Sequence, residues 1–190
     1  MKTLTVFILC GGKSTRMQSE KGLVLFQEKP FIEHIIKAIL PITDQIKLIT
    51  GSKEYDYLEY QKIPDIILDK GPLGGIYTAL SNSGTEFNLI LSCDIPLIST
   101  ELLQELISKH TKEAGITVFA SESKTHPLIG IYSKDILPII KEAIDSDELK
   151  MMDLLAKVPH QILNIEESEN FPLTNINSAD ELNDLNINSI

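Results

Sequence analysis

The chain has few cysteines, few cations and no long apolar run, and each shortage excludes a class of protein. Among 190 residues there are two cysteines, Cys10 and Cys93, without CxxC spacing or a histidine cluster, so neither zinc nor a disulfide framework is expected. Lysine and arginine number 17 against 27 acidic residues, and the net charge of -10 argues against long nucleic acids, which bind basic surfaces. No apolar run could span a membrane, and the opening MKTLTVFIL is expected to form a strand rather than a signal peptide. We expect a cytoplasmic protein that binds neither nucleic acid nor membrane.

The most informative stretch is LTVFILCGGKSTRMQSEK. Its apolar, β-branched start predicts a buried strand over 4–9, which ends at Gly11 and Gly12, where the backbone can turn sharply. Arg16 and Lys21 follow the glycines. A strand, a glycine turn with free N–H groups and nearby cations together form a binding site for a polyphosphate.

Three known phosphate-binding loops do not fit this stretch. A Walker A loop needs a glycine five positions before Gly12, where Phe7 stands. The dinucleotide and kinase loops need three spaced glycines, but the next glycine after Gly12 is Gly22. A glycine pair with separate cations remains, and in an acidic protein these cations, with a divalent metal, must reverse the local charge.

The chain alternates strands and helices over its first two-thirds. This order indicates βαβ units, and therefore an α/β fold with a single-domain, doubly wound, mostly parallel sheet over residues 1–190. Further strands are expected at 46–50, 65–68, 87–92, 116–120, 128–132 and 160–165. Helices are expected at 30–40, 54–61, 76–82, 101–110, 134–144, 148–158 and 178–184.

A second candidate site lies in LILSCDIPL, where a buried strand delivers Asp94 to its carboxyl end and Pro96 ends the strand. Ligands of open α/β sheets bind at the carboxyl ends of the strands, where Gly11 also lies. If the first and fourth strands are neighbours, Asp94 can hold Mg2+ against phosphates, because Mg2+ takes oxygen ligands and only one or two carboxylates. The alternative is an ordinary turn aspartate before proline.

A third candidate is DKGPLGGIYTAL. Its glycines around Pro72 let the backbone approach a flat ligand before a helix begins. A plain Gly-Pro turn with a solvent-facing acid is the alternative.

The segment LCGGKSTRMQSEKGLVLFQEKPFIEHII resembles the signature of the nucleotidyltransferases, most closely that of the molybdenum cofactor guanylyltransferases, Leu-Ala-Gly-Gly-x-Ser-x-Arg-Met-Gly-x-Asp-Lys. It departs from this pattern at Cys10, Gln18 and Glu20. GPLGG resembles the Gly-Pro-Leu-Ala-Gly segment at the guanine end of the nucleotide, which the sister cytidylyltransferases lack. Weaker matches in THPLIGIYS and NINSADEL extend the resemblance over nearly the whole chain.

The resemblance implies a Rossmann-like enzyme that transfers GMP from GTP to the terminal phosphate of molybdopterin or molybdenum cofactor and releases pyrophosphate. It implies Mg2+ as cofactor, held by Asp94. Arg16 suits the β- and γ-phosphates because its guanidinium can contact two oxygens, and Lys21 suits the α-phosphate. These three residues are the expected catalytic residues. Residues 1–112 would form the nucleotide-binding half and 113–190 the acceptor-binding half, with transient contacts to other molybdenum cofactor proteins.

The expected nucleotide-binding residues extend over the three loops. They are Leu9, Cys10, Gly11, Gly12, Lys21, Ser52, Asp69, Gly71, Pro72, Leu73 and Asp94. Ser52 belongs to the segment GSK, which stands where the family often has Ala-Asn-Arg. For the acid at the guanine end we favour Asp69, because it ends the expected strand, while Asp65 has the longer spacing usual in the family and stays open.

On the acceptor side the resemblance indicates His126, Asn175 and Asn177. His126 would contact the acceptor phosphate, or is simply a loop residue before proline. The two asparagines could bind the acceptor or tie the loop ahead of the last helix.

Two other classes of function stay open. A related transferase could use CTP on molybdopterin or act on a sugar phosphate. A non-catalytic nucleotide-binding module could keep the fold without turnover, but Arg16, Lys21 and Asp94 together disfavour it, because a sensor has no need to stabilise leaving pyrophosphate.

Overall fold

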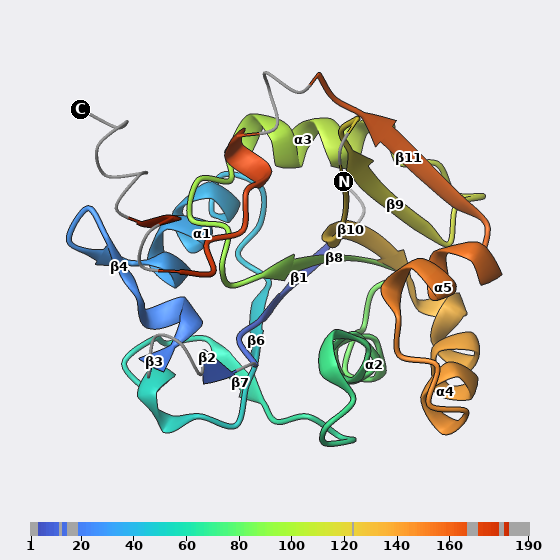
Figure 1. The fold of residues 1–190 in the computed structure, drawn as a ribbon, viewed down its shortest axis with the longest axis horizontal. Helices are drawn as coiled ribbons and strands as arrows, with labels where there is room; N and C mark the ends of the chain where they lie inside the picture. The colour runs from blue at the N-terminus through green and yellow to red at the C-terminus, as the bar shows by residue number, and fades with distance from the viewer. Residues whose placement is uncertain are drawn as a thin grey trace.

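The computed structural model describes residues 4–11, 13–14, 19–122, 124–166, 171–178 and 181–182. Its main sheet has seven strands in the order β11-β9-β10-β8-β1-β6-β7 (Figure 1). These strands are β1 (Thr5–Leu9), β6 (Ile46–Ile49), β7 (Gln61–Ile63), β8 (Phe87–Ser92), β9 (Ile116–Ala120), β10 (Thr125–Ser133) and β11 (His160–Asn164). The α-helices are α1 (Phe31–Ile39), α2 (Gly71–Ser81), α3 (Thr100–Lys109), α4 (Leu137–Asp145) and α5 (Met151–Lys157).

Shorter elements connect this framework. Four two-residue strands form two small hairpins: β2 (Lys13–Ser14) with β3 (Ser19–Glu20), and β4 (Leu25–Phe26) with β5 (Lys29–Pro30). Single 3-10 turns are η1 (Lys21–Leu23), η2 (Lys53–Tyr55), η3 (Lys134–Ile136) and η5 (Phe171–Leu173). None of the described helices has the length and apolar character needed to cross a bilayer.

The sheet is mostly parallel, as the alternation of strands and helices predicts. β1 runs parallel to both β6 and β8, β6 to β7, and β9 to β11, while β10 is antiparallel to its neighbours. Leu9 pairs with Ser92, so β1 and β8 end side by side. The expectation that the first and fourth strands are neighbours is therefore confirmed, and the residues after them emerge at one edge of the sheet. Strands from both expected halves of the chain share this sheet.

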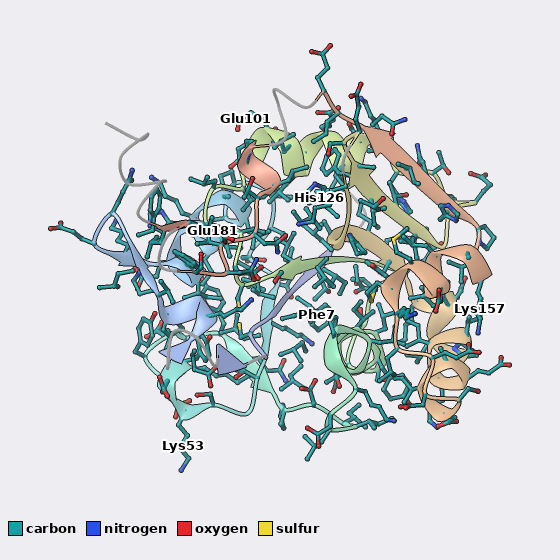
Figure 2. All side chains as sticks on the ribbon, in the orientation of Figure 1. Phe7, Lys53, Glu101, His126, Lys157 and Glu181 are labelled. Carbon is teal, nitrogen blue, oxygen red and sulfur yellow. The ribbon has the colours of Figure 1, made fainter. Side chains whose placement is uncertain are left out.

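Helices cover both faces because the central strands are apolar on both sides. Val6 and Ile8 pack in one hydrophobic cluster, with residues of α1 and α3, whereas Phe7 and Leu9 pack in the other, with residues of α2, α4 and α5. This division follows from the two-residue period of a strand. Figure 1 shows α1 and α3 on one side of the sheet and α2, α4 and α5 on the other. Figure 2 shows Phe7 in the interior and Lys53 and Lys157 pointing outward.

Three expected elements differ from the structure. The strand expected at 65–68 is wrong: β7 lies earlier and ends before Pro64. The helix expected at 54–61 is also wrong, because only the turn η2 forms there. α2 begins at Gly71 rather than after the glycines, since Pro72 in its first turn is compatible with helix initiation. The expected helix at 178–184 lies largely outside the described residues.

Candidate active site

Asp94 lies at the carboxyl end of β8, just beyond the last paired residues of the sheet. The backbone N–H of Cys93 donates to the Leu9 carbonyl (3.2 Å), which extends the contact between the two strands up to Asp94. The Asp94 side chain is buried, and its Oδ1 accepts hydrogen bonds from Ser92 Oγ (2.5 Å) and Asn175 Nδ2 (2.7 Å). A buried carboxylate must be compensated by such partners, so its orientation is well defined.

Lys21 supplies the opposite charge. Its Nζ donates to Asp94 Oδ2 (3.1 Å) and to Asn177 Oδ1 (2.6 Å). Lys21 and Asn177 are 156 positions apart in the chain. The ammonium group thus contacts the carboxylate oxygen that Ser92 and Asn175 leave open. The structure brings Lys21 and Asp94 together, as the sequence predicts; their catalytic roles stay a prediction.

The segment 174–177 completes this arrangement. The backbone N–H of Ile176 donates to the Asp94 carbonyl (2.9 Å), which places Asn175 and Asn177 on either side of that anchor. Glu181 Oε2 accepts from the backbone N–H of Asn177 (2.6 Å), and the Glu181 N–H donates to Ser178 Oγ (3.2 Å). The asparagines therefore tie the loop to the site, and whether they also bind the acceptor stays a prediction.

The first glycine loop is described only in part. Gly11 is exposed at the end of β1, while Gly12 and Arg16 lie outside the described residues. Leu9 is buried against α2, where a Cβ on Gly75 would lie 3.3 Å from Leu9 Cδ2. A glycine at this position allows the helix to pack closely on β1.

The two cysteines lie next to each other below this loop. Both are buried, and the pKa of the Cys10 thiol is raised by its hydrogen bond with Cys93 and by burial. Tyr55 lies against the same pair, and burial raises its pKa as well. A Cβ on Gly22 would lie 2.8 Å from Tyr55 Oη, so a glycine is required directly after Lys21. Both cysteines pack in the core at the end of β1 and β8.

The loop before α2 changes the choice between the two candidate acids. Asp69 is exposed, has φ of 60°, and does not end a strand. Asp65 lies beside the first glycine loop: a Cβ on Gly11 would be 3.7 Å from Asp65 Oδ2. Among the described residues Asp65 Oδ1 is buried without a hydrogen-bond partner, and burial raises the pKa of the carboxyl while the Thr78 hydroxyl opposes that shift. The reason for favouring Asp69 was wrong, and the geometry favours Asp65.

The remaining predicted nucleotide-binding residues lie at the same sheet edge. Gly71 and Pro72 form the first turn of α2, and Gly71 has φ of 54°, which glycine adopts without strain. The Leu73 side chain is fully buried in the core, so only its backbone could face a ligand. Ser52 follows β6 and accepts a hydrogen bond from the Glu54 N–H (3.3 Å), capping η2.

His126 is not a loop residue. It lies in β10 opposite Phe119 of β9, just before a register shift at Gly130, and is buried (Figure 2). Its predicted contact with the acceptor phosphate stays a prediction. Ser92, whose hydroxyl holds the Asp94 carboxylate, was not predicted from the sequence. Its position two residues before Asp94 is the signal that could have found it, because i and i+2 side chains share a face of extended backbone.

Residues 6–162 match the family model described as the MobA-like NTP transferase domain. The chain belongs to the MobA-like NTP transferases. This MobA-like chain is 90% identical over 188 residues to a Flavobacterium johnsoniae protein named probable molybdenum cofactor guanylyltransferase, with 99% of each chain covered. A Carboxydothermus hydrogenoformans protein of the same name is 35% identical, with 88% of this chain and 84% of that protein covered.

Solved structures share the fold of this MobA-like chain. A putative protein from Aquifex aeolicus matches with a TM-score of 0.79 and 25% identity, over 92% of this chain and 93% of that one. Molybdopterin-guanine dinucleotide biosynthesis protein A from Archaeoglobus fulgidus matches with a TM-score of 0.82 and 21% identity, over 97% and 98%. The predicted fold class and the predicted family, a nucleotidyltransferase, are confirmed.

Proposed function

We propose that this protein transfers GMP from GTP to the terminal phosphate of molybdopterin or molybdenum cofactor and releases pyrophosphate. The observation that carries the proposal is the contact of Lys21 with Asp94 where β1 and β8 end, in a chain 90% identical to a protein named probable molybdenum cofactor guanylyltransferase. Both residues lie where ligands of parallel sheets bind. The reaction would take place in the cytoplasm, whose reducing conditions suit two free, buried cysteines.

The side chains at Asp94 fit a magnesium ion. Oδ1 is held by Ser92 and Asn175, whereas the partner of Oδ2 among the described residues is the Lys21 ammonium, which a metal ion could replace. In the described part of the chain no three histidine, cysteine or acidic side chains gather around one point, so Asp94 would share the ion with phosphate oxygens. When bound, Mg2+ would neutralise charge on the reacting phosphates.

The chain's own residues bind and orient the substrates. Lys21, released from Asp94 by the incoming charge, binds the α-phosphate, where negative charge accumulates in the transition state. Arg16 binds the β- and γ-phosphates and so stabilises the leaving pyrophosphate. No side chain forms a covalent intermediate, because such transfers rely mainly on positioning and charge stabilisation.

The guanine base is read by Asp65. Guanine presents two neighbouring N–H donors on its pairing edge, and an ionised carboxylate accepts from both. Asp65 Oδ1 is buried without a partner among the described residues, and Oδ2 faces the Gly11 backbone. Cytosine offers only one donor there, so GTP should be preferred to CTP.

This proposal is tested by incubating the purified protein with molybdopterin and GTP, CTP or ATP, and measuring pyrophosphate and the dinucleotide product. We expect one pyrophosphate per guanine dinucleotide with GTP and little product with CTP. Turnover of CTP in preference to GTP would indicate a cytidylyltransferase. Activity with a sugar phosphate but not with molybdopterin would indicate the other transferase, and no pyrophosphate with any pair would indicate a binding module.

Asp65→Asn should lower kcat/KM for GTP by about 10- to 100-fold, because one carboxylate oxygen becomes a donor that opposes a guanine N–H. Asp69→Asn should leave kcat/KM for GTP within about twofold, since Asp69 is exposed on the loop. Burial raises the pKa of Asp65, and only the ionised form accepts two hydrogen bonds. GTP affinity should therefore fall on acidification at a higher pH than the pKa of an ordinary aspartate, and Asp65→Asn should lose this dependence. The reverse ranking of the two variants would assign the base to Asp69.

A further inference from the structure

The turn between β9 and β10 brings a second lysine to the site. The backbone N–H of Ser121 donates to the Lys124 carbonyl (2.8 Å), which closes this turn and fixes the Lys124 backbone. The Lys124 side chain then crosses to the segment 174–177, where Nζ donates to Asn175 Oδ1 (3.2 Å). Lys124 is thus bound to a segment 51 positions away in the chain.

Asn175 connects Lys124 to Asp94. Its Oδ1 accepts from Lys124, and its Nδ2 donates to Asp94 Oδ1 (2.7 Å). Since the two ends of one amide group are about 2 Å apart, Lys124 Nζ lies within about 8 Å of the Asp94 carboxylate. The two asparagines play matching parts: Asn177 Oδ1 accepts from Lys21, and Asn175 Oδ1 accepts from Lys124. Two lysines from distant parts of the chain are therefore connected to Asp94, Lys21 directly and Lys124 through Asn175.

The charge of Lys124 is not neutralised by an acid. Several lysines of this protein pair with carboxylates: Lys21, Lys70, Lys109, Lys141 and Lys157. For Lys124, by contrast, no carboxylate of the described residues lies within salt-bridge distance, and its side chain donates to the neutral amide of Asn175. In a protein of net charge -10, an exposed lysine beside the site without an acidic partner remains available to bind an anion.

The proposed reaction brings a second anionic phosphate, that of the acceptor, to this place. A new bond forms between an oxygen of the acceptor phosphate and the α-phosphorus of GTP. The bond from that phosphorus to the bridging oxygen breaks, and the electron pair leaves with pyrophosphate. Two anionic phosphates must therefore meet beside the Asp94 carboxylate, and Lys21 can serve only one of them.

Resting on the proposed function, we infer that Lys124 binds the terminal phosphate monoester of the acceptor and holds its oxygen toward the α-phosphorus. Asn175 keeps the ammonium at the site until the acceptor arrives. Because the phosphate dianion is a stronger partner than a neutral amide oxygen, the acceptor displaces Asn175 from Lys124. Lys21 then serves the nucleotide and Lys124 the acceptor, with Asp94 between them.

The test compares Lys124→Gln, Lys124→Arg and the control Lys141→Gln, using molybdopterin as acceptor and GTP as donor. Lys124→Gln should raise KM for molybdopterin about 10- to 100-fold and change KM for GTP by less than about twofold, because one charged hydrogen bond to one substrate is lost. Lys124→Arg keeps the charge and should stay within about fivefold of the wild type. Lys141 pairs with Asp145 on the surface of α4, so Lys141→Gln makes the same charge change and should leave both KM values unaltered.

A structural role would produce a different result. If Lys124 only ordered the segment 174–177, Lys124→Gln would raise both KM values together and lower the midpoint of thermal unfolding. That result, or unchanged KM values for both substrates, would overturn the inference while the wild-type reaction stood. Absence of GMP transfer by the wild-type protein would overturn the proposed function and, with it, this role of Lys124.

Discussion

Replacement of Asp94 by asparagine should reduce kcat/KM for GMP transfer by about 1000-fold or more, because it removes the only carboxylate that contacts Lys21 in the described structure and with it the proposed metal ligand. Asparagine keeps an oxygen at Oδ1 to accept from Ser92 and Asn175. Its amide nitrogen at the other position would face the Lys21 ammonium, donor against donor. Transfer is measured as pyrophosphate released with GTP and molybdopterin.

The fold should survive this change. Lys21 is about a quarter exposed, so its ammonium can turn to solvent once the carboxylate is absent. We expect the free energy of unfolding in urea to change by no more than about 1 kcal/mol. Asp145→Asn, on the surface of α4, removes the same charge far from the site and is the matched control. Near-normal turnover by Asp94→Asn would contradict the role given to Asp94.

Lys21→Ala should have the second largest effect. It removes the cation assigned to the α-phosphate, and we expect kcat/KM to fall by about 100- to 1000-fold. Unlike Asp94→Asn, it leaves a buried carboxylate without its counter-charge, so the free energy of unfolding should fall by about 1–3 kcal/mol. Activity is measured as above and stability by urea denaturation at the same pH.

A double variant separates the two effects of Lys21. In Lys21→Ala with Asp94→Asn the unpaired buried charge at position 94 is removed, so most of the lost stability should return, while transfer stays absent. Lys29→Ala, on the exposed hairpin of β4 and β5, controls for loss of one lysine. Equal instability of the single and double variants would show that the ion pair does not stabilise the fold.

Sequence patterns predicted the central strands well because those strands are buried on both faces. β1 and β8 appear in the sequence as mainly apolar runs, and their bounds agree with the structure to within one residue. β7 was missed because the edge strand QKI carries two polar residues, and the apolar run after Pro64 was taken for the strand instead. That run lies in an irregular loop, where Ile66 and Leu68 are exposed.

The contact between Lys21 and Asp94 was predictable because local sequence motifs place both residues. Lys21 and Asp94 each follow a recognisable strand and turn, and the parallel pairing of β1 with β8 brings them together. The reason for choosing Asp69 was wrong because the strand expected to end there lies earlier, at Gln61–Ile63. Lys124 could not be identified from the sequence. Its contact with Asn175 depends on how the β9–β10 turn packs against the segment 174–177, and local sequence patterns do not predict such long-range packing.

The central claim is that Lys21 and Asp94 mark one nucleotide site at the ends of β1 and β8. A crystal structure with Mg2+ and a non-hydrolysable GTP analogue tests it most directly. We predict the metal on Asp94, the α-phosphate on Lys21 and the guanine on Asp65. A nucleotide bound at another edge of the sheet, with the contact between Lys21 and Asp94 unchanged, would contradict the account.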